Sequence, residues 1–394
     1  MDFEFTSEQT QLSDAVRRFI EKDYGFATRS NIVATQAGTS DAVWKQLVDL
    51  GLTALPLPEE QGGFGGTAVD MLLVMTELGR GLMAEPYFAT VFAAEFIKRA
   101  GNASQKVLLE RVADGSAKLA AALAERESRF DLLDVATTAA ASDGGFVLSG
   151  RKAVVPYGAQ ADMLVVSART SPASASDSAL SLFIIDAHAK GVAIRDFRSL
   201  DGTRVAEIEF ENVALGADAL LGELGGAAPV IDAVADYGVA LLCAEAVGAM
   251  EALNAATLEY AKTRRQFGQP IARFQVLQHR MVEMFMHLEQ ARSMAYLAAV
   301  KVDSADLGER RRAASSAKVR IGQAARYIGQ QAVQIHGGMG VTNELPAAHL
   351  FKRLTMIELT LGDSDHHLAH FVAESRAQNE SSEKAEPVRL QEAA

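Results

Sequence analysis

The stretches Tyr260-Ala-Lys-Thr-Arg-Arg-Gln-Phe-Gly268 and Gln334-Ile-His-Gly-Gly-Met-Gly340 share one arrangement, because each ends a long amphipathic pattern with glycine. Exposed backbone and polar side chains therefore meet where a helix is expected to end. An arginine beside free backbone N–H groups suits the pyrophosphate of a dinucleotide. A basic helix end capped by glycine is the simpler interpretation, and it explains each residue type but not the whole string.

The sequence around these stretches has a helical period. Phe274, Leu277, Met281, Met284, Phe285 and Leu288 form an apolar stripe, which predicts a helix of about 27 residues. Helices of this length usually pack together, so we expect a C-terminal four-helix bundle at residues 225–377. The charged segment 378–394 is predicted to be a flexible tail.

The first half of the chain divides into two patterns. Residues 1–118 repeat apolar side chains at helical spacing, which predicts an N-terminal helical domain. Residues 119–224 shift toward a period of two, as in Val205-Ala-Glu-Ile-Glu-Phe210, and predict a middle domain of antiparallel strands, a barrel or sandwich. The predicted fold class is therefore α+β, mainly α, with a β domain between a helical domain and a bundle.

Composition narrows the function classes. With 394 residues, of which 49% are hydrophobic, the chain reads as a soluble globular protein, and its net charge of -12 disfavours nucleic acid as a partner. The single cysteine, Cys243, fits a reducing compartment. The most apolar stretch, 234–250, is too short to span a bilayer, and the N-terminus lacks a secretion signal, so we expect no membrane partner and a cytoplasmic location.

Longer strings resemble the acyl-CoA dehydrogenase family. They are Tyr260-x-x-x-Arg-Arg-Gln-Phe-Gly-Gln-Pro-Ile271, Gln334-x-x-Gly-Gly-x-Gly340, Trp44-x-x-Leu-x-x-Leu-Gly51 and Pro58-Glu-Glu-x-Gly-Gly-x-Gly65. The similarity covers nearly the whole chain, and the predicted domain order is the family's. The resemblance implies a flavoprotein oxidoreductase that uses FAD to desaturate the α,β bond of an acyl-CoA in fatty or dicarboxylic acid degradation, with an electron-transfer flavoprotein as acceptor.

The resemblance also implies which residues hold the ADP part of FAD. Guanidinium pairs with pyrophosphate, an aromatic ring offers an apolar face, and glycines permit close backbone approach. In the family these residues serve an FAD that lies mainly in the neighbouring subunit, so a tetramer is implied. The matching residues are Arg265, Gln266, Phe267, Gln334, Gly337 and Gly338.

The flavin side departs from the family's pattern. Where members typically carry Thr-Glu-Pro-x-x-Gly-Ser-Asp, this chain has Ala124-Glu-Arg-Glu-Ser-Arg-Phe-Asp131 and lacks both flavin-binding hydroxyls. The family's Gly-x-Lys-x-Trp-Ile-Thr segment is Gly150-Arg-Lys-Ala-Val-Val-Pro156. Val154 thus replaces an indole, and Pro156 replaces a threonine.

The residue at the expected catalytic-base position also differs from the family's pattern. The reaction needs a carboxylate beside the substrate Cα, but the family's usual Glu position is Leu361, and an alternative base position falls near Gly238. Asp363 is our candidate base, although an N-cap role in the last helix explains it more simply. Glu245 is a weaker candidate.

Three of the C-terminal acidic and histidine residues share a helix face. Asp363, His367 and His370 stand at i, i+4 and i+7, a spacing that metal ligands can also use. We interpret them as a polar helix face or a subunit contact, because zinc has no place in the family's chemistry. No metal site is predicted.

The leading hypothesis combines these observations. The chain resembles the small subunit of pimeloyl-CoA-dehydrogenase-like enzymes in Ala124-Glu-Arg and Gly362-Asp-Ser-Asp-His-His367. We expect it to complete a partner's FAD site, with a hetero-tetramer favoured over a homotetramer. A homo-oligomeric dehydrogenase with Asp363 as base and a flavin-free structural subunit remain alternatives. The acyl chain stays open between a fatty acid, a dicarboxylate and a ring-bearing acid.

Overall fold

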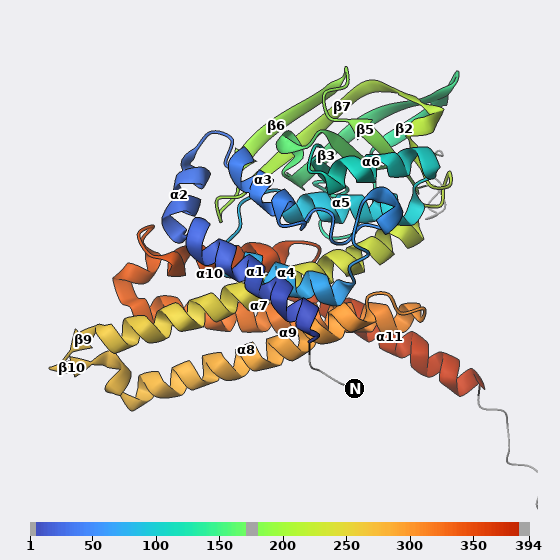
Figure 1. Cartoon of the computed structure of the whole chain (residues 1–394). Coiled ribbons are helices and arrows are strands. Elements are labelled where there is room, and N and C mark those ends of the chain that lie inside the picture. The colour runs from blue at the N-terminus through green and yellow to red at the C-terminus, as the bar shows by residue number, and fades with distance from the viewer. Residues whose placement is uncertain (1–4, 171–179, 386–394) are drawn as a thin grey trace, which may run out of the picture.

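The computed structural model describes residues 5–170 and 180–385. A β-sheet forms one side of the molecule, the long C-terminal helices form the other, and N-terminal helices lie between them (Figure 1). The predicted class, α+β and mainly α, is confirmed. Within the described residues, no helix combines the length and apolar character needed to cross a membrane.

The N-terminal helices start at well-formed caps. Thr6 accepts a hydrogen bond from the backbone N–H of Gln9 at 3.2 Å, and the Gln9 side chain accepts one from the Thr6 N–H at 3.1 Å. Thr67 and Asp70 repeat this capping box, which satisfies N–H groups that a helix cannot pair by itself. The helices are α1 (Ser7–Asp23), α2 (Phe26–Ala34), α3 (Asp41–Asp49), α4 (Ala68–Arg80), α5 (Tyr87–Ala100) and α6 (Ala103–Ala113).

The sheet has the strand order β6-β7-β3-β2-β4-β5-β8, with β1 beside β4. Most neighbours are antiparallel, as predicted, but β1 and β2 pair with β4 in parallel. A parallel pair needs a long crossover, which the intervening chain supplies here. The strands are β1 (Leu119–Ala122), β2 (Thr138–Ser142), β3 (Gly145–Pro156), β4 (Met163–Arg169), β5 (Leu180–Asp186), β6 (Val192–Arg198), β7 (Arg204–Gly216) and β8 (Leu220–Leu221).

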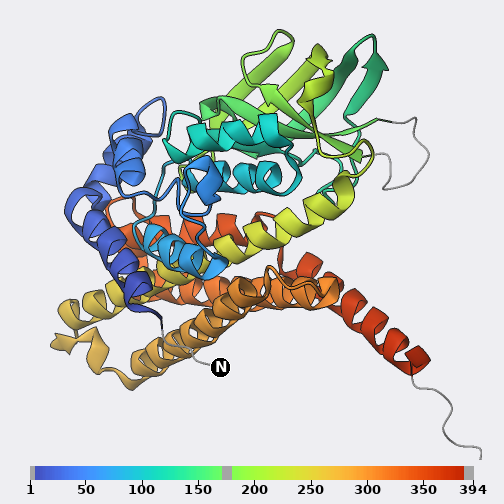
Figure 2. The same cartoon turned by 45° about the vertical axis from the view of Figure 1, so that its right-hand side comes forward.

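The C-terminal part is a bundle in which α9 packs against α7, α8, α10 and α11. A two-stranded turn, β9 and β10, joins α7 to α8, and α11 projects from the bundle (Figure 2). Because α11 continues to Ala385, the helix passes the expected start of the tail at residue 378, and residues 386–394 lie outside the described part. The elements are α7 (Ala227–Thr263), β9 (Arg265–Gln266), β10 (Gln269–Pro270), α8 (Gln275–Lys301), α9 (Leu307–His336), α10 (Pro346–Leu359) and α11 (Ser364–Ala385).

The apolar stripe on α8 is only partly buried. Met284 and Leu288 are buried in the core, whereas Phe285 is 58% exposed. The predicted helix is confirmed, but its apolar stripe is wider than the face that this chain buries. One residue further along a helix turns the side chain by about 100°, which carries Phe285 off the buried face of this chain.

Two glycines allow α4 and α7 to cross in direct contact. A Cβ added at Gly248 would lie 1.7 Å from the carbonyl oxygen of Thr76, and one at Gly79 would lie 2.0 Å from that of Glu245. Both contacts are with backbone, which cannot rotate away as a side chain can. The N-terminal part is therefore seated on the bundle at a distance that only glycine permits.

Replacing Gly248 by alanine should destabilise the protein by about 3 kcal/mol, because the added methyl group would force two helix backbones apart. Gly338→Ala is the matched control, since a Cβ there meets nothing within 4 Å, and its stability should stay within about 0.5 kcal/mol of the wild type. Urea unfolding of the purified chain measures both. Equal stabilities of the two variants would contradict the close helix crossing.

Candidate active site

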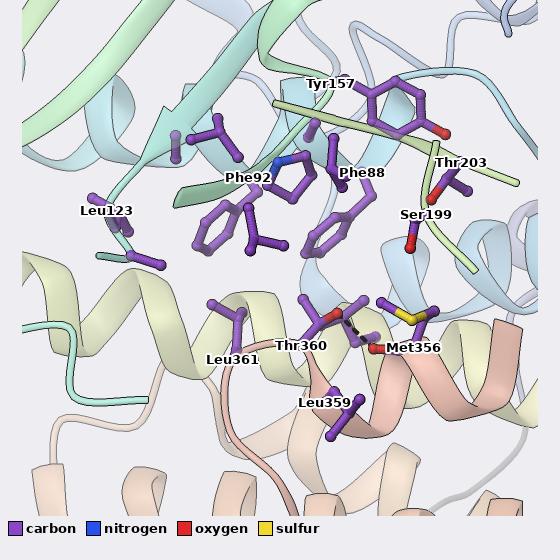
Figure 3. Close-up of a pocket in the computed structure, with 18 of the residues that line it drawn as sticks. Phe88, Phe92, Leu123, Tyr157, Ser199, Thr203, Met356, Leu359, Thr360 and Leu361 are labelled. Atoms are coloured by element: carbon purple, nitrogen blue, oxygen red, sulfur yellow. Dashed lines mark hydrogen bonds between the residues drawn. The ribbon is translucent and has the colours of Figure 1, made fainter. Parts of the chain in front are cut away.

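A cavity of about 630 Å³ lies where the three parts of the chain meet. Its walls come from α4 and α5, from β1 and β3, and from α7 and α10 with the loop after α10. Figure 3 shows Leu123 and Leu361 on one side of the cavity and Tyr157, Ser199 and Thr203 on the other. Stacked aromatic rings, Phe88 and Phe92 at 5.5 Å between centroids, form part of the largely apolar wall.

The structure brings both expected base positions to one place in this cavity. Leu361 lines the cavity, and its Cδ1 lies 2.7 Å from where a Cβ at Gly238 would stand. Neither residue carries a carboxylate. An acyl group bound here would meet a leucine and a bare helix backbone where the family places its base.

Hydrogen bonds from two buried side chains hold the loop that carries Leu361. The Lys318 ammonium donates to the backbone carbonyls of residues 358, 360 and 362, the last at 2.8 Å. His367 donates from Nε2 to the Leu361 carbonyl at 2.8 Å, because a carbonyl can only accept. Burial lowers the pKa of Lys318 to about 8 and that of His367 to about 3, so His367 stays neutral. Leu361 adopts a left-handed backbone conformation, with φ of 57°.

Asp363 has a structural role at the start of α11. Its Oδ1 accepts a hydrogen bond from the His366 backbone N–H at 2.8 Å, and its carbonyl accepts one from His367 at 3.0 Å. Its Oδ2 lies 3.6 Å from Nη2 of the exposed Arg129. Asp363 is not among the described residues that line the cavity, although its neighbour Gly362 is. The geometry gives this carboxylate a cap function, and its use as a base stays a prediction.

The histidines after Asp363 gather without forming a metal site. The rings of His366 and His370 lie 4.3 Å apart, and His367 also contacts the Ser315 hydroxyl at 3.3 Å. In the described part of the chain, no group of three or more potential ligands is arranged to hold a metal ion.

Glu245, which lines the cavity, is fully engaged with Arg353. The guanidinium donates to both Glu245 oxygens, at 2.6 and 2.8 Å, and to Asp201 at 2.9 Å. This bidentate contact occupies both oxygens of the Glu245 carboxylate. Glu245 is therefore a structural ion-pair partner in this geometry.

Glu85 is the carboxylate that the sequence analysis missed. It lines the cavity and is 3% exposed. Its Oε2 accepts a hydrogen bond from the Ser40 backbone N–H at 3.0 Å, whereas its Oε1 has no hydrogen-bond partner in the structure. Burial raises the pKa of Glu85 to about 7. A single charge within the apolar run 82–92 was the signal in the sequence.

The positions where the resemblance expects flavin-binding hydroxyls carry none in this chain. Ala124, Val154 and Pro156 line the cavity there. The nearby Ser128 hydroxyl is used locally, because it donates to the Glu125 carbonyl at 3.2 Å. Glu125 itself is buried and pairs with Lys152 at 2.7 Å. Ser128 and Glu125 thus make contacts within the protein, and Glu125 also forms part of the cavity wall.

The residues expected to bind ADP lie together at the end of the bundle where α7 and α9 terminate. The Tyr260 ring stacks on His336 at 4.4 Å between centroids, which ties the two helix ends together. Phe267 is 91% exposed, and a Cβ at Gly337 or Gly338 would meet nothing within 4 Å. All six residues are exposed, and none lines the described cavity: Arg265, Gln266, Phe267, Gln334, Gly337 and Gly338.

Three family models match successive parts of the chain. Acyl-CoA dehydrogenase, N-terminal domain, matches residues 6–116; the middle domain matches 120–213; and the C-terminal domain matches 228–375. The chain belongs to the acyl-CoA dehydrogenase family. This family consists of FAD-dependent oxidoreductases that act on a CH–CH bond.

Individual relatives agree with this assignment. The probable acyl-CoA dehydrogenase YngJ of Bacillus subtilis is 30% identical over 372 residues, covering 93% of this chain and 97% of that protein. The structure of butyryl-CoA dehydrogenase from Megasphaera elsdenii has a TM-score of 0.87 at 26% identity, covering 95% and 100% of the two chains. A variant of the Tcur3481-Tcur3483 steroid ACAD has a TM-score of 0.86 at 26% identity, covering 95% and 99%.

Replacing Glu85 by glutamine should stabilise this acyl-CoA dehydrogenase increasingly as the pH rises. With a folded-state pKa of about 7 and an ordinary value of 4.5, the folded state binds more protons between these values and loses stability as the pH rises through them. Glutamine does not titrate. The stability difference between variant and wild type should therefore grow by up to about 3 kcal/mol, measured by urea unfolding from pH 4 to pH 8.

Glu127→Gln is the control for this experiment, because it removes the same charge from an exposed side chain that does not line the main cavity. Its stability difference from the wild type should stay nearly constant with pH. A constant difference for Glu85→Gln would show that the buried carboxyl keeps its ordinary pKa.

Asp363→Ala should destabilise the protein by about 1 kcal/mol through loss of the N-cap, whereas Asp363→Asn should leave stability unchanged because asparagine caps equally well. Thermal unfolding of the two variants and the wild type measures these differences in stability. If Asp363 only caps α11, the asparagine variant also keeps the acyl-CoA oxidation rate of the active assembly. A stable Asp363→Asn variant without turnover would instead identify the base.

Proposed function

We propose that this chain is one subunit of a hetero-oligomeric, FAD-dependent acyl-CoA dehydrogenase and that it completes an FAD site lying mainly in its partner. The strongest support for the proposal is the contrast between the end of the bundle and the chain's own cavity. The ADP-side residues are kept and open to solvent at the end of the bundle. The base position in the chain's own cavity is Leu361 beside Gly238.

The end of the bundle fits the ADP half of FAD. Arg265 carries the cation that a pyrophosphate needs, and its Nη2 already donates to the Gly268 carbonyl at 2.8 Å, which steadies the side chain. The open space at Gly337 and Gly338 lets a ligand reach the backbone. When bound, FAD supplies the hydride acceptor of the desaturation.

The cavity does not fit the flavin ring in the family's way. Ala124, Val154 and Pro156 stand where the resemblance expects hydroxyls and an indole. Without those donors, this chain lacks the family's means of orienting a flavin. The base and the flavin-binding hydroxyls of the working site are therefore assigned to the partner subunit.

An exposed apolar row along α8 supports the oligomer. An apolar row that is exposed to water is energetically unfavourable, and it typically marks a subunit contact. The name of the Tcur3481-Tcur3483 relative also joins two proteins. The row consists of Val276, Val282, Phe285, Met286, Leu297 and Val300, all more than a third exposed.

The remaining parts of the proposal follow the family. The assembly would oxidise the α,β bond of an acyl-CoA during fatty or dicarboxylic acid degradation and pass electrons to an electron-transfer flavoprotein. The single buried Cys243 suits a cytoplasmic location. A flavin-free structural subunit is less favoured, because such a subunit has no need for the exposed Arg265 and Phe267.

Arg265→Ala in this chain should lower the FAD bound by the co-expressed hetero-oligomer, because one pyrophosphate contact is lost at each site that this chain completes. We expect at least a tenfold rise in the Kd for FAD, typical of a lost charge-assisted hydrogen bond. Absorbance in the flavin bands, divided by the concentration of each chain, gives the stoichiometry.

The neighbouring Arg264→Ala is the matched control and should leave FAD binding unchanged. This chain expressed alone should contain little FAD. A fully flavinated, active homo-oligomer of this chain would overturn the proposal and favour the homo-oligomeric alternative with Asp363.

A further inference from the structure

We propose that the cavity of this chain selects an acyl group that carries a hydroxyl at its far end, and that Glu85 binds this hydroxyl. The proposal rests on the acyl-CoA function proposed above and deepens it by naming the class of acyl group.

The first argument is the unused hydrogen-bonding capacity of a buried carboxyl. Glu85 lines the cavity and is only 3% exposed. Its Oε2 accepts a hydrogen bond from the Ser40 backbone N–H, whereas its Oε1 has no hydrogen-bond partner. Buried polar atoms in folded proteins nearly always have a partner, so an unpaired one that faces a cavity calls for an explanation. A ligand in the cavity is the missing partner of Oε1.

The second argument is that Glu85 is held rigidly before any ligand arrives. The preceding residue, Ala84, donates its N–H to the Tyr24 hydroxyl at 2.9 Å, and its carbonyl accepts from the Tyr157 hydroxyl at 2.7 Å. Arg29 donates to the carbonyl of Leu82 at 3.2 Å. A carboxyl on such a fixed turn can select a ligand without the entropic cost of ordering a loop.

The third argument comes from the charges around Glu85. The nearby Lys118 is paired with Asp41 at 3.0 Å, and Arg353 is committed to Glu245 and Asp201. Arg126 and Arg129 also line the cavity, but they are paired with Glu207 and Asp363. A terminal carboxylate beside Glu85 would therefore be repelled, and each of these four cations already has an acidic partner. This disfavours the dicarboxylic class that the sequence left open.

A hydroxyl fits Glu85 better than an ammonium does. A hydroxyl can donate to the ionised carboxylate and accept from the protonated carboxyl, so it pairs with Glu85 in both states. An ammonium needs the ionised form and would bring a second charge into an apolar cavity at a large desolvation cost.

The placement of the residues suits an acyl group lying across the cavity. Tyr157 holds the turn of Glu85, and Figure 3 draws Tyr157 on the side of the cavity opposite Leu361 and Leu123. We place the thioester end of the acyl group on the Leu361 side, next to Gly238, so that its far end extends toward Glu85. Between the two sides lie Phe88 and Phe92, which suit the apolar body of the acyl group.

Isothermal titration of the purified full chain tests the proposal. The probes are hexanoyl-, octanoyl- and decanoyl-CoA, each compared with its ω-hydroxy and ω-carboxy derivative. At the chain length that reaches Glu85, the ω-hydroxy compound should bind about tenfold more tightly than the plain acyl-CoA, as expected for one buried hydrogen bond. The ω-carboxy compound should bind most weakly.

Two variants separate selection from a general loss of structure. Glu85→Leu should abolish the preference for the hydroxyl while still binding plain acyl-CoA. Glu85→Gln should improve binding of the ω-carboxy compound, because the amide can donate to it without repulsion. Glu127→Gln, which removes the same charge outside the main cavity, should keep the wild-type order.

Equal affinities for plain and ω-hydroxy compounds at every length would overturn this inference while leaving acyl-CoA binding intact. Tightest binding of the ω-carboxy series in the wild type would overturn it in favour of a dicarboxylic substrate. If no acyl-CoA binds at all, the inference fails together with the acyl-CoA function of this cavity, whereas FAD completion in the partner is judged separately by flavin stoichiometry.

Discussion

The buried guanidinium of Arg353 is the contact on which the arrangement of this molecule depends. It reaches from α10 to Glu245 on α7 and to Asp201 on the turn between β6 and β7. The Asp201 carbonyl in turn accepts from Arg29 of α2 at 2.8 Å. Removing one member would leave an unpaired charge in a poorly solvated place, which typically costs about 3–5 kcal/mol. All three parts of the chain are thereby fixed around one cavity, and Arg353 and Glu245 form part of its wall.

The residues that hold the cavity walls together differ from those that could contact a ligand inside it. Glu245 pairs with Arg353, and Asp363 caps the start of α11, so two carboxylates near the cavity make structural contacts. Lys318 fixes the loop of Leu361 by its backbone carbonyls, whatever side chain that loop presents. The loop is therefore held in place although the position where the resemblance expects the base is Leu361. Such a division fits the proposed subunit whose partner performs the chemistry, and Glu85 is a cavity-lining carboxyl with an unpaired oxygen.

The sequence was sufficient for the fold class because helical and strand periods reflect burial along a single element. The 27-residue helix at Gln275–Lys301 and the strand at Arg204–Gly216 follow directly from such patterns. The exposure of Phe285 could not be predicted, because periodicity marks an apolar face without saying whether this chain or another one covers it. The parallel pairing of β1 with β4 was also beyond reach, since alternation within a strand carries no information about its neighbour.

By itself, the sequence determined which chemical groups are present: the six residues expected on the ADP side, the hydroxyls absent from the expected flavin side, and a leucine at the expected base position. Only the tertiary structure decided which of them meet. It brought Leu361 and Gly238 to one point from positions far apart in the chain, and it placed Glu85 in the same cavity with an oxygen unpaired. The physical reason is that a side chain's pKa and its unmet hydrogen bonds depend on neighbours contributed by other elements, and those neighbours are chosen by packing in three dimensions.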